Sequence, residues 1–190
     1  MADQILELKD VTKIFGGLIA LDNFCMCLKR GEIHALIGPN GSGKSTCLNV
    51  VSGFYRPTNG KVLLNNRDIT GIAPHRIALS GIGRTFQNIR LFLGLSVLEN
   101  VMVPVYSKAN ISLATVIAGT KKSSVIEKAI KEKAEKWLDF LGLIDLKDKG
   151  VSDLTAGQQR LVEFARVMAK EPEVLLLDEP AAGFSLKRMP

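Results

Sequence analysis

Residues 38–46 read GPNGSGKST and directly follow the apolar residues 34–37, HALI. The string matches the pattern G-x-x-x-x-G-K-[ST], which requires a strand before it and a helix after it. Its glycines allow a tight turn that points successive backbone N–H groups toward one ligand, and the helix adds its positive N-terminal end. We therefore predict a strand at residues 32–38, then a loop at residues 38–46, called the phosphate loop below, and then a helix.

The phosphate loop predicts binding of a nucleotide, ATP or GTP. Lys44 is expected to reach the β- and γ-phosphates, Ser45 to place its hydroxyl on Mg²⁺ and Thr46 to bond the α-phosphate. The binding residues predicted in this loop are Gly38, Asn40, Gly41, Ser42, Gly43, Lys44, Ser45 and Thr46. A glycine-rich turn that only joins a strand and a helix is the alternative, and the complete pattern in this context weighs against it.

An acid pair follows a second apolar run, in EVLLLDE at residues 173–179. Asp178 is predicted to hold Mg²⁺ through water, and Glu179 is predicted to orient and deprotonate the attacking water as the catalytic base. An ordinary carboxylate is a weak base, but it suffices because phosphoryl transfer depends mostly on positioning and charge stabilisation. A solvent-facing acid pair at a strand end would be preferred if the phosphate loop were absent.

Composition restricts the class of protein. A chain of 190 residues with 46% hydrophobic content buries a sizeable core, in one domain or two lobes. No window approaches the roughly 18 consecutive apolar residues of a membrane helix, and residues 1–10 lack a signal peptide, so we expect a cytosolic chain. The net charge of +6 is largely interleaved with acids, as in residues 123–137, and no nucleic-acid binding is predicted.

Hydrophobic periodicity predicts the secondary structure. Alternating or short apolar runs predict strands at residues 5–11, 20–29, 61–66 and 173–178. A 3.6-residue period predicts a helix over 126–141, stopped by Gly142, and a second helix around 161–168. Capping boxes are predicted at Ser96 with Glu99 and at Ser124 with Glu127. Buried, reduced thiols are predicted for the three cysteines, Cys25, Cys27 and Cys47.

A third string, LTAGQQR at residues 154–160, stands just before the helix that leads to the acid pair. It resembles the signature motif of the ATP-binding cassette (ABC) ATPases, usually Leu-Ser-Gly-Gly-Gln, and is called the signature segment below. TFQ, ending at Gln87, resembles the Q-loop of that family, and AAG after Pro180 resembles the start of its D-loop. The strings occur in family order. GGLIALDN, GIGRTFQNIRLF, LSVLENV and LDEPAAG are similar to the ATPases of bacterial branched-chain amino acid importers.

The resemblance implies a site shared by two subunits, in which ATP lies between the phosphate loop of one and the signature segment of the other. Thr155 would offer a hydroxyl and Gly157 an N–H to the γ-phosphate, with Gln158 beside them. Ala156 departs from the glycine of the usual motif, which puts close approach of the partner nucleotide in doubt. The alternative is that the segment forms only the start of a helix.

Two further residues take their expected roles from the resemblance. Phe15 stands where the family places an aromatic side chain that stacks on adenine, although an aromatic residue at a strand end is often only core. Gln87 would contact Mg²⁺ and the attacking water, and so counts as both a catalytic and a metal-site candidate. It also lies at the hinge into the helical stretch. The apolar side chains around it would form a groove for a helix of a membrane-spanning partner or pack into the core: Phe86, Leu91, Phe92, Leu93, Leu95 and Val97.

The implied fold is α/β, with a P-loop NTPase (RecA-like) core, an antiparallel β subdomain and a helical subdomain. The expected divisions are residues 1–87 for the core with the β subdomain, 88–153 for the helical subdomain, and 154–190 for the signature helix, the acidic strand and the D-loop. ABC ATPases continue into a further core strand, a switch histidine and C-terminal helices. His34 and His75 both precede the signature segment. A truncated, marginally stable chain is therefore expected.

The predicted function is that of the ATP-binding and hydrolysing subunit of an ABC importer, for branched-chain amino acids, with ATP and Mg²⁺ as cofactors. This chain is expected to bind MgATP but to hydrolyse it poorly. Expected partners are transmembrane permease subunits, a second ABC ATPase subunit and, indirectly, a periplasmic or extracellular binding protein. The expected location is cytoplasmic, peripheral on the inner face of the cell membrane. The alternatives are a non-catalytic nucleotide-binding remnant and a soluble ABC ATPase.

Overall fold

The computed structural model describes residues 4–86, 89–108 and 121–178. The chain divides into two compact units, which are described separately. The first unit contains the residues up to Ile82 together with residues 173–176, and the second contains residues 83–172 and those after Leu176. The domain divisions predicted from the sequence remain a prediction.

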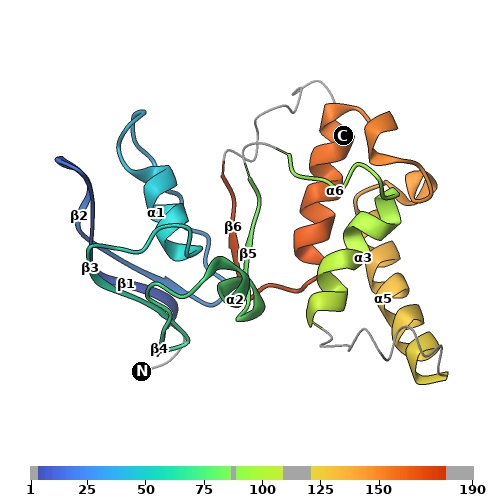
Figure 1. Cartoon of the computed structure of the whole chain (residues 1–190), viewed down its shortest axis with the longest axis horizontal. Coiled ribbons are helices and arrows are strands. Elements are labelled where there is room, and N and C mark those ends of the chain that lie inside the picture. Colours follow the sequence, from blue (N-terminus) through green and yellow to red (C-terminus); the bar gives the residue numbers. More distant parts are fainter. Residues whose placement is uncertain (1–3, 87–88, 109–120, 179–190) are drawn as a thin grey trace. The chain divides into compact units, whose positions relative to one another are not determined.

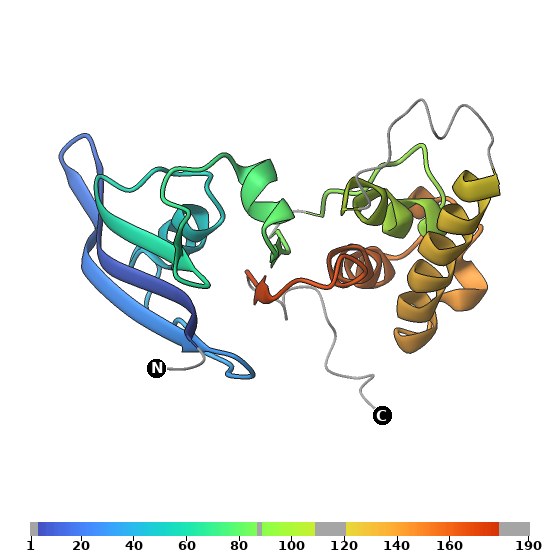
Figure 2. The ribbon, with the colours of Figure 1, turned by 90° about the horizontal axis from the view of Figure 1, so that it is seen from below.

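The first unit is built on a four-stranded sheet in the order β2-β1-β3-β4, with antiparallel pairing throughout (Figures 1 and 2). Its strands are β1 (Gln4–Phe15), β2 (Leu18–Lys29), β3 (Asn59–Leu64) and β4 (Arg67–Asp68). Gly16 has a φ of 56° in the turn from β1 to β2, and Asn65 and Asn66 have φ values of 49° and 61° in the turn from β3 to β4. Such left-handed residues match the twist of paired strands. The predicted strands in these regions are confirmed.

Two helices accompany this sheet, α1 (Lys44–Val51) and α2 (Pro74–Leu79). Helix α1 packs against β2, and its buried residues Cys47, Val50 and Val51 join the core of the first unit. That core contains further aliphatic side chains, most of them from the strands, with Ile77 from α2 and Ile69 from the segment after β4: Ile5, Leu6, Leu8, Val11, Leu21, Val62, Leu64, Ile69, Ile77, Ile82, Val174 and Leu176. Burial of these apolar side chains holds the phosphate loop between β2 and α1.

The strand predicted at residues 32–38 is absent. These residues have no regular structure, and Ile33 and Ile37 are 97% and 92% exposed. A strand persists only where its backbone N–H and C=O groups bond to a neighbour. In the described part of the chain no strand pairs with this segment, and β5 (Ile82–Arg84) and β6 (Val174–Leu176) form a separate two-stranded sheet. The apolar sequence alone is therefore not enough for a strand here.

Helices build the second unit, in which α3 (Val97–Lys108), α5 (Lys121–Phe140) and α6 (Ala156–Met168) pack on one another (Figure 1). Two short 3-10 helices, Ile144–Leu146 and Val151–Asp153, lead from α5 into α6. Their shared core contains mainly small and aliphatic residues: Val97, Leu98, Val101, Met102, Val105, Ile130, Ala134, Leu138, Leu143, Val151, Leu154, Val162, Ala165 and Ala169. Both predicted helices are confirmed. No helix among the described residues is long and apolar enough to span a membrane.

The predicted helix ends are partly right. Ser96 and Glu99 form the expected capping box before α3, because the Ser96 N–H donates to Glu99 Oε2 at 2.7 Å and the Glu99 N–H donates to Ser96 Oγ at 3.2 Å. Gly142 follows α5 with a φ of 68°, as expected of a left-handed stop. Ser124 lies inside α5, which already begins at Lys121, so the second predicted capping box is wrong.

The cysteine prediction holds for one residue of the three. All three thiols are free, but Cys25 is exposed and Cys27 is half-buried. Cys47 is buried in α1, and burial raises the pKa of its thiol to about 11 because the thiolate loses its hydration. Cys25 lies on the outer strand β2, where its Sγ donates to Asp10 Oδ1 at 3.3 Å. Alternation along a strand buries only one face, and this cysteine occupies the other.

Candidate nucleotide-binding site

Glycines shape the phosphate loop. Gly43 precedes α1 with a φ of 88°, and a Cβ at this position would collide with the Ala20 carbonyl oxygen of β2. A Cβ on Gly38 would lie 2.6 Å from Ser42 Oγ. The Ser42 N–H donates to the Pro39 carbonyl oxygen at 3.2 Å and closes the turn. Gly43 needs glycine because the loop folds against the backbone of β2 with a left-handed φ, whereas the space at Gly38 is limited by the Ser42 side chain.

The Lys44 ammonium lies over the loop that precedes it. Its Nζ donates to the carbonyl oxygens of Gly38 and Pro39, at 2.7 Å each, and lies 3.4 Å from Ser42 Oγ. Lys44, Ser45 and Thr46 form the first turn of α1, where backbone N–H groups lack partners within the helix. The structure thus gathers a cation, two hydroxyls and a helix N-terminus around one loop. An incoming phosphate would compete with the two carbonyls for Lys44.

Phe15 ends β1 and is 39% exposed, so it is not a core residue. Its ring contacts the ring of Tyr55 edge-on, with centroids 5.1 Å apart and an interplanar angle of 76°. The Lys13 ammonium lies 4.8 Å from the Phe15 centroid and 5.9 Å from the Tyr55 centroid. Sequence reasoning missed Lys13 and Tyr55. The alternation along β1 offers a signal for Lys13, which shares a strand face with Phe15.

The signature segment forms the N-terminus of α6, in the second unit. Thr155 is the N-cap, and its Oγ1 accepts from the Gln158 N–H at 3.3 Å while its own N–H donates to Gln158 Oε1 at 3.0 Å. This reciprocal pair is a capping box. Among the residues that the structure describes, a Cβ added to Gly157 would meet no atom within 4 Å outside its own stretch of helix. The segment therefore starts a helix, and its glycine faces open space.

Asp178 follows β6 and pairs with Arg84, the last residue of β5. Arg84 Nη2 lies 3.2 Å from Asp178 Oδ2, and both side chains are mostly buried. Arg84 also lies 5.2 Å from the centroid of the Phe86 ring. The sequence reasoning missed this partner. Glu179 and Gln87, the two predicted catalytic residues, lie outside the described residues.

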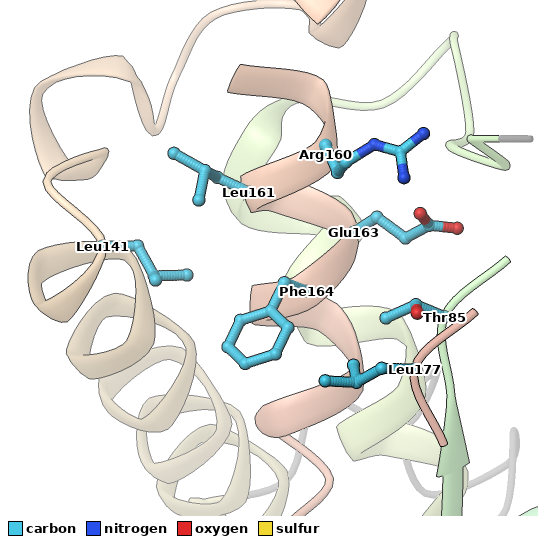
Figure 3. Close-up of a pocket in the computed structure, with 7 residues that line it drawn as sticks. All are labelled: Thr85, Leu141, Arg160, Leu161, Glu163, Phe164 and Leu177. Atoms are coloured by element: carbon cyan, nitrogen blue, oxygen red, sulfur yellow. The ribbon is translucent and has the colours of Figure 1, made fainter. Parts of the chain in front are cut away.

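Sequence reasoning also missed a buried acid on α6. Glu163 is only 1% exposed and lines a cavity of about 230 Å³ in the second unit (Figure 3). The other residues that line this cavity are Thr85, Leu141, Arg160, Leu161, Phe164 and Leu177. Burial raises the pKa of Glu163 because the charged carboxylate loses its hydration. The positive charges of Arg166 and Arg160 and hydrogen bonds from the backbone at Arg90 and Phe86 lower the pKa, but by less. The sequence gives no signal for this burial, because the residues three and four positions away on α6 are mostly polar: Gln159, Arg160, Arg166 and Val167.

Comparison with known proteins decides the family. The model of the family described as "ABC transporter" matches residues 21–182, which contain both the phosphate loop and the signature segment. The chain belongs to the ABC transporter family. This ABC chain is of the ATPase class, whose catalytic activity is ATP hydrolysis coupled to transport.

Among curated relatives, the "High-affinity branched-chain amino acid transport ATP-binding protein LivG" of Salmonella typhimurium is 38% identical over 187 residues. The match covers 98% of this ABC chain and 73% of the relative. BraF of Pseudomonas aeruginosa, which carries the same descriptive name, is 37% identical over the same shares. A probable LivG of Archaeoglobus fulgidus is 41% identical over 95% of this chain and 69% of the relative.

Solved structures agree with the fold. A crystal form of an ATP-binding cassette of an ABC transporter is 35% identical, with a TM-score of 0.80, over 97% of this chain and 72% of that one. The ADP conformation of a cassette also aligns at 35% identity, with a TM-score of 0.78, over the same shares. A dimeric bacterial ABC transporter cassette is 29% identical, with a TM-score of 0.78, over 95% of this chain and 76% of that one. The predicted α/β, P-loop NTPase fold class is confirmed.

Proposed function

We propose that this chain is the ATP-binding and hydrolysing subunit of an ABC importer, with branched-chain amino acids as the transported cargo. The observation that carries the proposal is the phosphate loop, in which Lys44 lies above a glycine turn at the N-terminus of α1. This arrangement suits a polyphosphate because a cation and unpaired N–H groups converge on one place. The names of LivG and BraF support the cargo.

Within this proposal, the phosphate loop holds the nucleotide of its own subunit. Lys44 exchanges the carbonyl oxygens of Gly38 and Pro39 for β- and γ-phosphate oxygens. The Ser45 hydroxyl and the Asp178 carboxylate suit Mg²⁺, which prefers hard oxygen donors and retains several waters. Asp178 can serve in this way because Arg84 engages its Oδ2 and leaves Oδ1 for a metal-bound water. The bound ion would neutralise charge between the phosphates.

Catalytic roles are proposed for Glu179 and Gln87 because of the motifs in which they stand: the acid pair after an apolar strand and a string that resembles the Q-loop of the family. Glu179, the residue that follows Asp178 in the sequence, would orient and deprotonate the attacking water. Gln87 would contact Mg²⁺ and that water. Slow hydrolysis is proposed for the chain on its own, because the proposed site is complete only with the signature segment of a second subunit.

The signature segment is proposed to contact the nucleotide of a second subunit. Gly157 is the second residue of α6, where its N–H has no partner within the helix. Nothing in the described part of this chain explains Gly157, since a Cβ there would meet no atom within 4 Å. An approaching phosphate would explain it, with the Gly157 N–H and the Thr155 hydroxyl as donors and Gln158 beside them. The neighbouring structure titled a dimeric cassette supports such pairing.

The remaining partners are proposed to be transmembrane permease subunits and, indirectly, a periplasmic or extracellular binding protein, with this chain on the cytoplasmic face of the membrane. The segment before α3 supports a permease contact. Phe92 and Leu93 are exposed apolar side chains in it, whereas Val97 is buried in the core of the second unit. The groove expected from the sequence is thus divided between surface and core, and its exposed part offers apolar area to a partner helix.

Titration with a fluorescent ATP analogue in the presence of Mg²⁺ tests the proposal. Binding should be saturable in the wild type and should weaken about 10- to 100-fold in Lys44→Ala, since a charge-assisted contact is lost. Lys61→Ala, at an exposed position on β3, is the matched control and should bind like the wild type. Equal binding by both variants would contradict a nucleotide site at the phosphate loop.

A further inference from the structure

Three side chains form a compact cluster at the exposed end of β1 in the first unit, and it is called the Phe15 cluster below. It consists of Phe15, Tyr55 and Lys13, with the ring centroids 5.1 Å apart and the ammonium within 4.8 Å of one ring centroid and 5.9 Å of the other. Phe15 and Tyr55 are 39% and 38% exposed. Aromatic and cation–π contacts at such distances favour one ring orientation.

Hydrogen bonds fix the backbone on both sides of the cluster. Lys13 Nζ donates to the Arg56 carbonyl oxygen at 2.9 Å, directly after Tyr55. Thr58 joins the same strand end twice, since its Oγ1 accepts from the Ile14 N–H at 3.0 Å and its N–H donates to the Thr12 carbonyl oxygen at 2.7 Å. The loop that carries Tyr55 is therefore tied to β1.

Tyr55 is also tied to the helix that begins at the phosphate loop. Its N–H donates to the Asn49 carbonyl oxygen at 3.1 Å, and Asn49 lies in α1 (Lys44–Val51). One short segment thus links the helix that carries Lys44 to the strand end that carries Phe15. The distance between a phosphate group on the loop and a base on the Phe15 ring is consequently set by this link.

Phe15 is 39% exposed, so part of its ring is accessible to a flat ligand. A cation over an aromatic ring occupies one of its two faces. A base that stacks on Phe15 must use the other face, and the ring is already oriented when the base arrives. Ordering a free, half-exposed side chain upon binding would weaken affinity, and a preorganised ring avoids that loss.

We propose that Lys13 and Tyr55 are positioning residues for base recognition, which hold the Phe15 ring at a fixed orientation and distance from the phosphate loop. The inference rests on the proposed nucleotide-binding function. It assigns the affinity for the base to the Phe15 cluster and the affinity for the phosphates to the loop. The two contributions are separable because inorganic tripolyphosphate carries the phosphates without a base.

The experiment measures dissociation constants of the purified chain for MgATP and for magnesium tripolyphosphate, by competition with a fluorescent ATP analogue. The dissociation constant for magnesium tripolyphosphate divided by that for MgATP reports the contribution of the base, and it falls when contacts to the base are lost. Phe15→Ala should lower this ratio about 5- to 150-fold, the range expected for loss of one base stack. Tyr55→Ala and Lys13→Met should each lower it about 2- to 10-fold. Tripolyphosphate should bind all variants as it binds the wild type, apart from a small loss of charge attraction in Lys13→Met.

Conservative variants separate positioning from folding. Tyr55→Phe keeps the edge-on ring contact and Lys13→Arg keeps a cation, so both should restore the wild-type ratio. Phe140→Ala is the matched control, because Trp137 and Phe140 form a similar edge-on pair in the second unit, 5.7 Å apart at 82°. An unchanged ratio in Tyr55→Ala and Lys13→Met would overturn the inference alone. Failure of wild-type chain to bind either ligand would overturn the proposed function and the inference together.

Discussion

The two units of the chain present ligand groups in different ways. In the first unit the candidate groups are mainly backbone N–H groups, and their positions depend on left-handed glycines such as Gly43 and on the close approach of β2. In the second unit they are side chains held by partners in the same unit: the Thr155 hydroxyl accepts from the Gln158 N–H, and Asp178 pairs with the Arg84 guanidinium. A backbone-shaped site tolerates little added volume, whereas a side-chain site depends on its partners. Substitutions should therefore damage the two units by different mechanisms.

The largest effect is expected from the buried pair in the second unit. Arg84→Met leaves Asp178 mostly buried without the guanidinium 3.2 Å away, so the free energy of unfolding should fall by about 3 kcal/mol. Chemical denaturation followed by circular dichroism measures it. A double substitution, Arg84→Met with Asp178→Leu, should recover most of the stability. Loss of less than about 0.5 kcal/mol in the single variant would mean that the pair is too well solvated to matter.

A slightly smaller loss of stability is expected in the first unit, with a larger loss of binding. Gly43→Ala places a Cβ against the Ala20 carbonyl oxygen at a φ of 88°. Strain of this kind is about 1–3 kcal/mol, and the loop must shift to relieve it, so ATP affinity should fall below detection. Gly17→Ala is the control, because a Cβ there meets nothing within 4 Å. Normal ATP binding by Gly43→Ala would show that the loop does not require this backbone shape.

Substitution of Thr155, the N-cap of α6, tests whether the second unit affects ATP binding by the isolated chain. Thr155→Ala removes the acceptor for the Gln158 N–H and should destabilise the chain by about 1 kcal/mol. ATP binding to the isolated chain should not change, since the proposed loop contacts lie in the first unit. Thr155→Ser keeps the hydroxyl and should retain the stability. A loss of ATP affinity in the isolated Thr155→Ala chain would contradict the assignment of this residue to the nucleotide of a second subunit.

The smallest effect is a change in pH dependence. The pKa of Glu163 is raised above its usual 4.5, chiefly by burial, so the folded chain retains a proton that the unfolded chain has released. Between 4.5 and the raised pKa, the free energy of unfolding therefore falls as pH increases, and it stays lower above that range. Glu163→Gln should remove this slope and be more stable at neutral pH by less than about 1 kcal/mol.

Thermal unfolding of the wild type and of Glu163→Gln across the acidic range measures this difference. The advantage of the variant should vanish below pH 4.5, where the wild-type carboxyl is protonated in both states. Glu132→Gln, at an exposed site on α5, should follow the wild type at every pH. A stability advantage of Glu163→Gln that persisted below that pH would show that packing, and not ionisation, separates the two proteins.

The sequence predicted local structure well where its cause was local. The pattern of α5 and α6, the box at Ser96 and Glu99 and the stop at Gly142 are confirmed because each depends on neighbours within a few residues. The strand at residues 32–38 failed because a strand needs a partner from elsewhere in the chain. The burial of Cys25 failed because alternation does not say which face of a strand is buried.

The sequence by itself determined the phosphate loop, the signature segment and the family, since these rest on residue types at fixed spacing within single segments. Only the tertiary structure decided that Arg84 pairs with Asp178, 94 positions later, that Lys13 and Tyr55 flank Phe15, and that Glu163 is buried. The reason is physical. Such contacts follow from how separate elements pack, and the many pairings that a sequence allows are distinguished only by burial and hydrogen bonding in the folded chain.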